Sequence, residues 1–277
     1  MARIIVTASK LNRRSGIVEN MADKSNIIDV VTKGFSFDSI SKLHNAAGDW
    51  YEDSSQRFYW GGGVLMTDDA APVVQPPPTV ASGISITQIK IATGSTTTNA
   101  EKFASFINDT CTKFQINTPI RILCFLAQIG HESGGLFFTE ELASGTAYEG
   151  RVDLGNTQPG DGVRFKGRGL IQITGRANYA AISNDLGTDF VAAPTLLGGK
   201  NANVCTPEQL KNAALSAGWF WNSRNLNAIA DKIDINKPIE DDANLDAFEA
   251  ITKKINGGTN GMPDRVARYK AGVQLFT

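Results

Sequence analysis

The spacing of hydrophobic residues changes along the chain. In the N-terminal part, short apolar runs at residues 4–7, 27–32 and 35–40 alternate with turn-prone residues. Short β-prone runs that are separated by turns predict strands. We therefore expect residues 1–67 to form a small all-β barrel.

A proline-rich stretch follows, and beyond it the hydrophobic period becomes helical. The prolines between residues 68 and 79 favour an extended spacer, and we assign residues 68–88 to a linker. From residue 89 onward, apolar residues recur at intervals of three and four, which places them on helix faces. Residues 89–277 are expected to form a mainly α-helical domain, so the whole chain is predicted to have an α+β fold.

Local start and stop signals locate several of these helices. Asn99 is a good N-cap for a first helix. The pair Thr118-Pro119 is a second start signal, and the almost wholly apolar segment up to Ser133 predicts a central, buried helix. A capping-box pattern at residues 206–209 opens another helix, and Gly257 ends one more.

Composition and charge limit the classes of partner. With 42% hydrophobic and 20% charged residues, the chain has the composition of a globular protein. A net charge of -1 gives no basic field for nucleic acid or an anionic membrane, and no apolar run approaches the roughly 20 residues of a membrane helix. We expect a monomer with neither kind of partner.

The three cysteines carry no recognisable site. Cys111, Cys124 and Cys205 cannot all pair with one another, and they lack the spacing of metal ligands. Buried apolar packing is the favoured interpretation. We therefore expect no disulfide framework, no metal and no cofactor.

Two glutamates are candidates for acid and base catalysis. Glu132 follows the apolar helix, where hydrophobic surroundings and the negative end of the helix dipole both disfavour its anion. A carboxylic acid that keeps its proton is what a glycosidase needs to protonate a departing sugar oxygen. Glu141 lies in a polar, turn-rich segment and would stay ionised as the base. The alternative is that both are solvated surface residues.

Motifs around these glutamates resemble glycoside hydrolase family 19, which contains plant chitinases and the chitinase-like endolysins of bacteriophages. The similarity covers the chain from about residue 90 to its end. In chain order the motifs are 128–135 (QIGHESGG), Glu141, 167–175 (GRGLIQITG), 217–221 (AGWFW), 226–227 (LN), 255–261 (INGGTNG), Asp264, Arg265 and Tyr269.

This resemblance implies a lysozyme-like catalytic domain and specific roles for its residues. Glu132 matches the general acid of the family and Glu141 its general base. Thr174 matches the hydroxyl residue that helps to hold the attacking water. The substrate-binding residues that we assign with it are His131, Gln172, Asn178, Tyr179, Asn256 and Arg265.

Structural alternatives remain open for several of these residues. Gln172 and Thr174 are also compatible with alternating positions of a short strand. Asn256 precedes a glycine and is compatible with a helix C-cap. His131 is more typical of a structural hydrogen-bonding histidine, and we give it a supporting role beside Glu132.

The sequence departs from the plant chitinases in ways that favour peptidoglycan as the substrate. Asn260 replaces the acidic residue that follows their Asn-Gly-Gly motif, and their cysteine framework is missing. The segment from Glu141 to Gly167 is short, which leaves less room for the loops that extend a chitin cleft.

The N-terminal region resembles bacterial SH3 domains through residues 9–16, 31–34, 48–51 and 59–64. Such domains accompany wall-degrading enzymes and bind wall peptides, so cell-wall peptides are the implied partner of residues 1–67. The alternative is a stabilising appendage without a ligand.

The resulting hypothesis is an inverting hydrolase that cleaves β-1,4 bonds of peptidoglycan glycan strands. A chitinase, a lytic transglycosylase that uses Glu132 alone and a non-catalytic wall-binding protein are the alternatives. The N-terminus lacks the pattern of a signal peptide because Lys10 and Arg13 interrupt its apolar run. Synthesis in the cytosol is therefore expected, with action at the cell wall after release by lysis, a holin or a secretion system.

Overall fold

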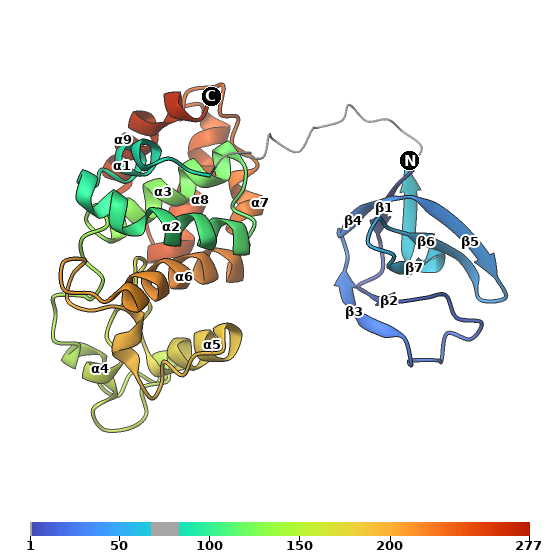
Figure 1. Ribbon diagram of the computed structural model, residues 1–277, viewed down its shortest axis with the longest axis horizontal. Coiled ribbons are helices and arrows are strands. Elements are labelled where there is room, and N and C mark those ends of the chain that lie inside the picture. The colour runs from blue at the N-terminus through green and yellow to red at the C-terminus, as the bar shows by residue number, and fades with distance from the viewer. Residues whose placement is uncertain (1, 68–82) are drawn as a thin grey trace. The chain divides into compact units, whose positions relative to one another are not determined.

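The computed structural model describes residues 2–67 and 83–277 (Figure 1). The chain forms two compact units, residues 1–75 and 76–277. Most of the predicted linker lies outside the described residues. Its assignment needs one correction, because helix α1 (Ile86–Thr93) already begins before residue 89. No helix in the described parts of the chain is long and apolar enough to cross a membrane.

The N-terminal unit consists of antiparallel strands in two sheets. One sheet has the order β4-β1-β8 and the other has the order β3-β2-β7-β6-β5. The strands are β1 (Ala2–Val6), β2 (Lys10–Arg14), β3 (Ile27–Thr32), β4 (Ser36–Ser39), β5 (Ser41–Asn45), β6 (Gly48–Glu52), β7 (Phe58–Trp60) and β8 (Val64–Thr67). The predicted all-β character is confirmed. The predicted closed barrel is not, since the described strands pair within two separate sheets.

An aromatic cluster forms the core of this β unit. Phe37 and Tyr59 stack with their ring centroids 3.9 Å apart, and Phe35 lies against Tyr59 at 6.0 Å. Ile4 and Val6 of β1, in the same sheet as Phe37, add to the cluster, whereas Tyr59 belongs to the other sheet. Two short sheets therefore share one hydrophobic core.

The C-terminal unit is helical, as predicted. Its helices are α1, α2 (Thr97–Lys113), α3 (Pro119–Glu132), α4 (Asp161–Arg164), α5 (Arg176–Leu186), α6 (Pro207–Ser223), α7 (Leu226–Ala230), α8 (Asp242–Asn256) and α9 (Met262–Gly272). Residues of α3 from Ile122 to Gly130 are all buried, and α1 and α9 pack against this helix. The prediction of a central, buried helix at this position is confirmed.

The N-terminal capping signals agree with the structure at two of three sites, and Gly257 is the C-cap of α8 as predicted. Thr118 caps α3, and Thr206 caps α6 in a complete capping box with Gln209. Asn99 is not a cap, because α2 begins earlier and Thr96 accepts the Asn99 backbone N–H at 3.1 Å. Thr96 is itself a good N-cap residue, and the sequence alone did not rank it above Asn99.

The three cysteines of this unit are free thiols, as predicted. Cys111 and Cys124 are buried free thiols, and Cys205 is a half-buried free thiol. Burial raises the pKa of Cys111 and of Cys124, so both thiols stay protonated.

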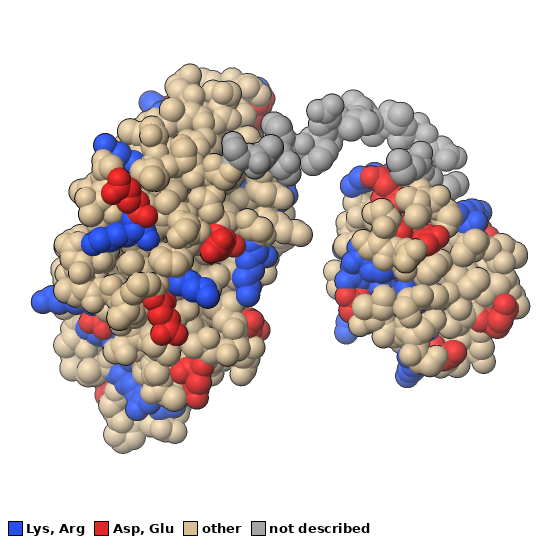
Figure 2. Space-filling model, in the orientation of Figure 1, with Lys and Arg blue, Asp and Glu red and all other residues tan. Residues whose placement is uncertain are grey.

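On the face of each unit that Figure 2 shows, acidic and basic side chains are interspersed, without a large patch of one sign.

Candidate active site

Glu132 is the last residue of α3, and its side chain is 17% exposed. The helix behind it is buried, so the carboxylate lies where the core meets the surface. Ser133 follows as the C-cap, and its hydroxyl donates to the Ile129 carbonyl at 2.6 Å. The end of α3 is therefore fixed at the residue that carries the carboxylate.

Arg265 of α9 holds the Glu132 side chain. The guanidinium is 1% exposed and donates to Glu132 Oε1 at 2.5 Å, to Gln128 Oε1 at 2.5 Å and to the Asn260 carbonyl at 3.2 Å. Gln128 in turn donates to Thr252 Oγ1 at 3.0 Å. A guanidinium with several fixed partners is a rigid anchor. This burial corrects the sequence prediction, because Arg265 positions Glu132 and has no surface to offer a sugar.

His131 lies beside this anchor and is oriented by Asp264. Its Nδ1 is 2.7 Å from Asp264 Oδ2, which also accepts from Arg268 Nε at 2.7 Å. Burial alone would raise the pKa of Asp264, but the hydrogen bonds from Arg268 and His131 outweigh it and lower that pKa. Gly261 has φ of 73°, and a Cβ there would lie 2.1 Å from the imidazole ring. Only glycine fits at this position, so the ring orientation depends on it.

Asn256 ends α8, and its side chain organises the following turn. Its Oδ1 accepts from the Gly258 backbone at 2.9 Å, and its Nδ2 donates to the Asn260 carbonyl at 2.9 Å. The same carbonyl accepts from Arg265. Gly257, in the left-handed conformation, is the C-cap. Asn256 therefore supports the loop that holds Arg265 from the last position of α8, and the C-cap that the sequence alternative gave to Asn256 is Gly257.

Glu141 is held through only one of its carboxylate oxygens. Its Oε2 accepts from the Tyr148 hydroxyl at 2.9 Å, whereas Oε1 is buried and has no partner among the described residues. Burial, together with the hydrogen bond to Glu141, raises the pKa of Tyr148, so the phenol keeps its proton and remains a donor. A buried carboxylate oxygen without a partner is costly unless a ligand or a water satisfies it.

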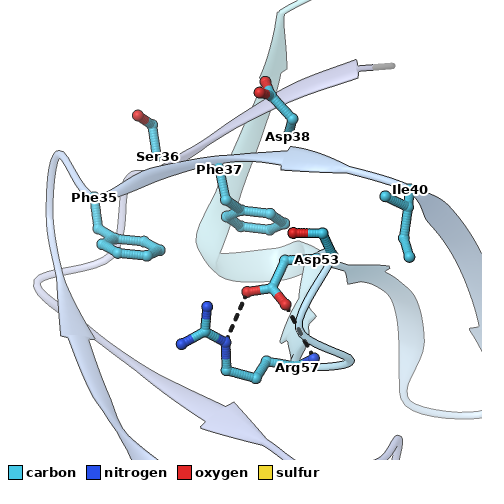
Figure 3. Close-up of a pocket in the computed structure, with 8 residues that line it drawn as sticks. Phe35, Ser36, Phe37, Asp38, Ile40, Asp53 and Arg57 are labelled. Atoms are coloured by element: carbon cyan, nitrogen blue, oxygen red, sulfur yellow. Dashed lines mark hydrogen bonds and ion pairs between the residues drawn. The ribbon is translucent and has the colours of Figure 1, made fainter. Parts of the chain in front are cut away.

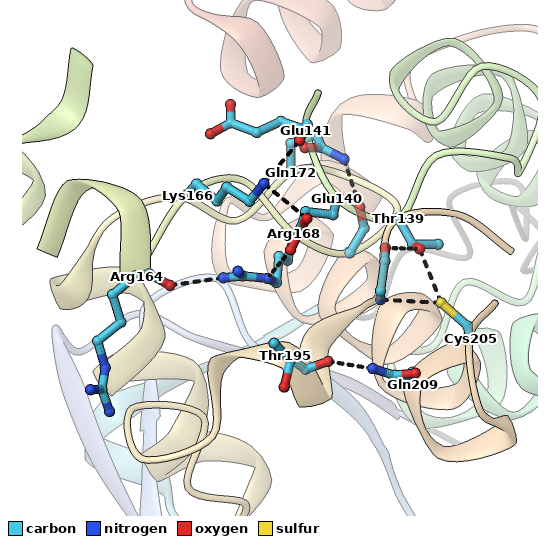
Figure 4. A network of polar contacts seen from close by, with 12 residues as sticks. Thr139, Glu140, Glu141, Arg164, Lys166, Arg168, Gln172, Thr195, Cys205 and Gln209 are labelled. Atoms are coloured by element: carbon cyan, nitrogen blue, oxygen red, sulfur yellow. Dashed lines mark hydrogen bonds and ion pairs between the residues drawn. The ribbon is translucent and has the colours of Figure 1, made fainter. Parts of the chain in front are cut away.

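Glu140, the preceding residue, fixes the backbone at this point (Figure 4). Its carboxylate pairs with Lys166 Nζ at 2.8 Å and with Arg168 Nε at 2.8 Å. Lys166 also reaches the Glu141 carbonyl at 3.3 Å, and the Glu141 backbone N–H donates to the Gly167 carbonyl at 3.0 Å. Two ion pairs of Glu140 and a backbone hydrogen bond of Glu141 thus fix the backbone position of Glu141.

Gln172 and Thr174 lie against the same backbone. A Cβ on Gly167 would lie 2.7 Å from Gln172 Oε1 and 3.2 Å from Thr174 Oγ1. Gln172 Oε1 is also buried without a partner among the described residues, and the residue adopts φ of 57° in a turn between Arg168 and Ile173. The alternative of a short strand is thereby excluded. Gln172, Thr174 and Glu141 converge on Gly167.

The structure separates the remaining pair, Asn178 and Tyr179. Asn178 is half-buried, and its Nδ2 donates to the Thr174 carbonyl at 2.8 Å, so it supports the turn that carries Thr174. Tyr179 is fully buried, and its hydroxyl donates to the Lys166 carbonyl at 2.8 Å and accepts from Arg168. The assignment of Tyr179 to substrate binding is corrected, because a fully buried ring cannot contact a sugar.

The candidate site thus consists of two clusters. The first surrounds Glu132 at the end of α3 and contains Arg265, Gln128, His131 and Asp264. The second, the turn cluster, surrounds Glu141 and contains Glu140, Tyr148, Lys166, Arg168, Gln172 and Thr174. The chain between them, residues 133–140, connects the end of α3 to the turn cluster. Among the residues that the structure describes, no hydrogen bond joins the two clusters. Each carboxylate is positioned by its own neighbours.

This arrangement lies within a segment that matches a known family. Residues 79–272 fit the family model of glycoside hydrolase family 19, described as chitinase class I. The chain belongs to glycoside hydrolase family 19. It is therefore a glycoside hydrolase of the chitinase and lysozyme type, and the resemblance inferred from its motifs is confirmed. The match begins at residue 79, so it leaves the SH3-like resemblance of the N-terminal unit unconfirmed.

Relatives of this family 19 chain come from bacteria and plants. A glycosyl hydrolase family 19 domain-containing protein of Haemophilus influenzae is 31% identical over 178 residues, with 53% of this chain and 76% of that protein covered. An Arabidopsis thaliana endochitinase is 34% identical over 137 residues, and the match spans 39% of its length. Chitinase C of Streptomyces griseus matches in structure with a TM-score of 0.48 and 20% identity, covering 70% of this chain and 92% of that one.

Sequence reasoning missed three residues of the candidate site. Tyr148 holds Glu141, Gln128 shares Arg265 with Glu132, and Asp264 orients His131. Gln128 and Asp264 lie inside the motifs that carry the resemblance, so their position was a usable signal. Tyr148 lies in a glycine-containing loop without any such signal.

Proposed function

We propose that the chain hydrolyses β-1,4 glycosidic bonds of peptidoglycan glycan strands, with Glu132 as general acid and Glu141 as general base. The main support is the unpartnered, buried Oε1 of Glu141. A general base needs one oxygen fixed for orientation and one oxygen free to accept a proton from water. Tyr148 holds Oε2, and Oε1 has no hydrogen-bond partner among the described residues.

The proposed reaction is a single displacement. Glu132, held by Arg265, protonates the glycosidic oxygen as the bond to the anomeric carbon breaks. Glu141 Oε1 takes a proton from a water that attacks the opposite face of the sugar, and Thr174 and Gln172 help to hold that water and the sugar. In enzymes of this kind the two carboxyl groups are roughly 6.5 to 9.5 Å apart and the anomeric configuration inverts. The reaction requires no redox change.

Chitin is the second candidate substrate. Plant relatives of this chain are endochitinases, and both polymers contain β-1,4-linked N-acetylated sugars. The short segment between Glu141 and Gly167 favours peptidoglycan, because it provides little chain for an extended cleft wall. The catalytic proposal for the two glutamates is the same for either polymer.

Digestion of two substrates by the purified chain tests the choice between them. Intact sacculi and chitin oligomers are incubated separately, and mass spectrometry identifies the products. Soluble disaccharide-peptide fragments from sacculi, released at a higher rate than chitin fragments, are the expected result. Rapid cleavage of chitin oligomers with sacculi left intact would replace peptidoglycan by chitin.

We further propose that the β unit binds the cell wall and thereby concentrates the enzyme on its substrate. The support is its compact fold, separate from the helical unit. Deletion of residues 1–66 should leave cleavage of short soluble oligosaccharides nearly unchanged and weaken lysis of sacculi, because a linked module raises the effective concentration at the surface. Equal loss on both substrates would indicate a structural role instead.

A further inference from the structure

The β unit contains a pocket of about 250 Å³ that combines apolar walls with positive charge. Leu11, Met21 and Trp60 form the apolar walls, and Lys10 and Arg14 also line it. None of the described residues that line this pocket is acidic. The pocket therefore has the electrostatic character of a site for an anion.

Arg14 is buried in a way that leaves its charge incompletely satisfied. It ends β2 next to an irregularity in the β2–β3 register between Arg13 and Arg14, and it is 1% exposed. Bulges of this kind re-aim side chains at the ends of strands. Its Nη1 donates to the Asp23 carbonyl and to Asn26 Oδ1, both at 2.8 Å. These partners are neutral, so neither of them neutralises the guanidinium.

The second terminal nitrogen of Arg14, Nη2, has an unsatisfied hydrogen-bonding capacity. Nη2 is buried and has no hydrogen-bond partner among the described residues. The Asp23 carboxylate accepts from the Ser25 backbone N–H at 2.8 Å and interacts electrostatically with Arg14, but the hydrogen bond between the two residues goes to the Asp23 backbone carbonyl. A buried guanidinium N–H without an acceptor is costly, and a bound anion would satisfy it.

The Trp60 ring packs closely against the Gly62 backbone in this pocket. A Cβ on Gly62 would lie 2.2 Å from the Trp60 ring, so the indole lies directly on the Gly62 backbone. The Trp60 Nε1 donates to the Ala47 carbonyl at 2.7 Å, which fixes the ring. The pocket thus has a rigid aromatic wall next to a cation, an arrangement that suits a small apolar group attached to an anion.

A second pocket of the β unit does not offer a free charge (Figure 3). It has a volume of about 430 Å³ and is lined by Phe35, Phe37 and Ile40, together with Asp53 and Arg57. Asp53 accepts from Arg57 Nε at 2.9 Å and from the Tyr59 hydroxyl at 2.7 Å. Its buried carboxylate forms an ion pair with Arg57, whereas Nη2 of Arg14 has no hydrogen-bond partner among the described residues.

We propose that the Arg14 pocket binds the C-terminal carboxylate of a short peptide that ends in a small apolar residue. The carboxylate accepts from Arg14 Nη2, with Lys10 at the rim as a second cation, and the terminal side chain lies against Trp60 and Leu11. Guanidinium groups suit planar carboxylates, and the apolar walls favour a peptide end over a fully hydrated phosphate. This site gives a ligand chemistry to the wall-binding role proposed above and rests on that role for its biological context.

Binding to the full chain, measured without any hydrolysis, tests the proposal separately from catalysis. N-acetyl-dialanine, the same compound with a C-terminal amide, and inorganic phosphate are titrated into labelled protein while the amide NMR signals of Gly62 and Gly63 are followed. The free acid should shift these signals and bind at least tenfold more tightly than the amide or phosphate. Equal affinity for acid and amide would refute a carboxylate site. Phosphate that binds as tightly as the acid would refute the peptide assignment.

Two variants and a matched control complete the test. Arg14→Met should abolish acid binding, with circular dichroism to check folding. Lys10→Glu changes only an exposed residue and should weaken acid binding at least several-fold even if Arg14→Met does not fold. Lys33→Glu makes the same charge change at an exposed residue that lines neither pocket, and it should bind like the parent. Equal affinity of Lys10→Glu and Lys33→Glu would overturn the proposed site.

Discussion

Glu132 and Glu141 belong to the same helical unit, but they are held by different means. Glu132 lies at the end of a buried helix and is fixed by Arg265, which is itself 1% exposed. Glu141 lies in a turn cluster, where a neutral phenol binds one oxygen and the other oxygen has no partner in the described part of the chain.

In the proposed mechanism, this difference suits the two carboxyl groups to separate tasks. The anchored carboxyl group, in its protonated form, is suited to transfer a proton to the leaving oxygen. The carboxylate with one unpartnered oxygen is suited to accept a hydrogen bond from a water. Environments that differ in this way are what allow two carboxyl groups in one site to take different roles.

The largest effect is expected for Glu132→Gln. The amide keeps an oxygen that can accept from Arg265, but it cannot donate the acid proton. Cleavage of sacculi should fall by about 10²-fold to 10⁴-fold with an unchanged helical signal. Glu101→Gln, which removes the same charge from an exposed position of α2, is the control and should retain parental activity. Activity of Glu132→Gln within a few-fold of the parent would exclude Glu132 as the acid.

A smaller but still large loss is expected for Arg265→Lys. Lysine keeps the positive charge but cannot reach Gln128, Glu132 and Asn260 together with one planar group. The misplaced carboxylate should lower kcat on the order of 10²-fold with a smaller change in KM. Steady-state kinetics on a soluble oligosaccharide measure both constants. A loss confined to KM would make Arg265 a binding residue and weaken the comparison.

For Tyr148→Phe a loss of about 10-fold in kcat is expected, since one hydrogen bond to a charged group contributes roughly 1.5 kcal/mol. The phenylalanine ring preserves the packing but leaves Glu141 Oε2 without its donor. Single-turnover rates on a soluble oligosaccharide provide the measurement. An unchanged rate would show that the turn cluster positions Glu141 through its backbone alone.

The smallest effect on activity is expected for Asp161→Asn, because the Asp161 carboxylate binds Arg176 and the Gln158 backbone N–H and no described hydrogen bond joins it to either glutamate. The hydrogen bonds from Arg176 to the buried Asp161 carboxylate lower the pKa of Asp161. A lowered pKa means that the pair stabilises the fold above the unfolded pKa of about 4, and that this stabilisation is lost as the pH falls through the lower, folded-state pKa. Urea unfolding at neutral pH should show a loss of about 2 kcal/mol. A difference from the parent that persists undiminished to strongly acidic pH would contradict this account.

Local signals in the sequence were sufficient for much of the helical unit. Thr118 with Pro119 located the start of α3, and the apolar body of that helix predicted its burial. The capping box at Thr206 located α6. Such signals act within one or two turns of a helix, so they can be read without knowledge of the tertiary fold.

Contacts between distant segments could not be predicted in the same way. The burial of Arg265 against Glu132, and of Tyr179 against Lys166, depends on how helices pack after they form. The sequence resemblance gave both residues a role in sugar binding because it records position in a motif and carries no information on exposure. The same holds for the β unit, where strand runs were visible but their division into two sheets was not.

The central claim, that Glu132 and Glu141 act as a separate acid and base, is tested most directly by the structure of the product. Proton NMR of a defined oligosaccharide during cleavage should detect a hydrated reducing end with the inverted anomer before it mutarotates, formed by single displacement. Glu141→Gln should remove most of this product. A 1,6-anhydro product from peptidoglycan, lighter by one water in mass spectrometry and still formed by Glu141→Gln, would contradict the claim and show that Glu132 acts alone.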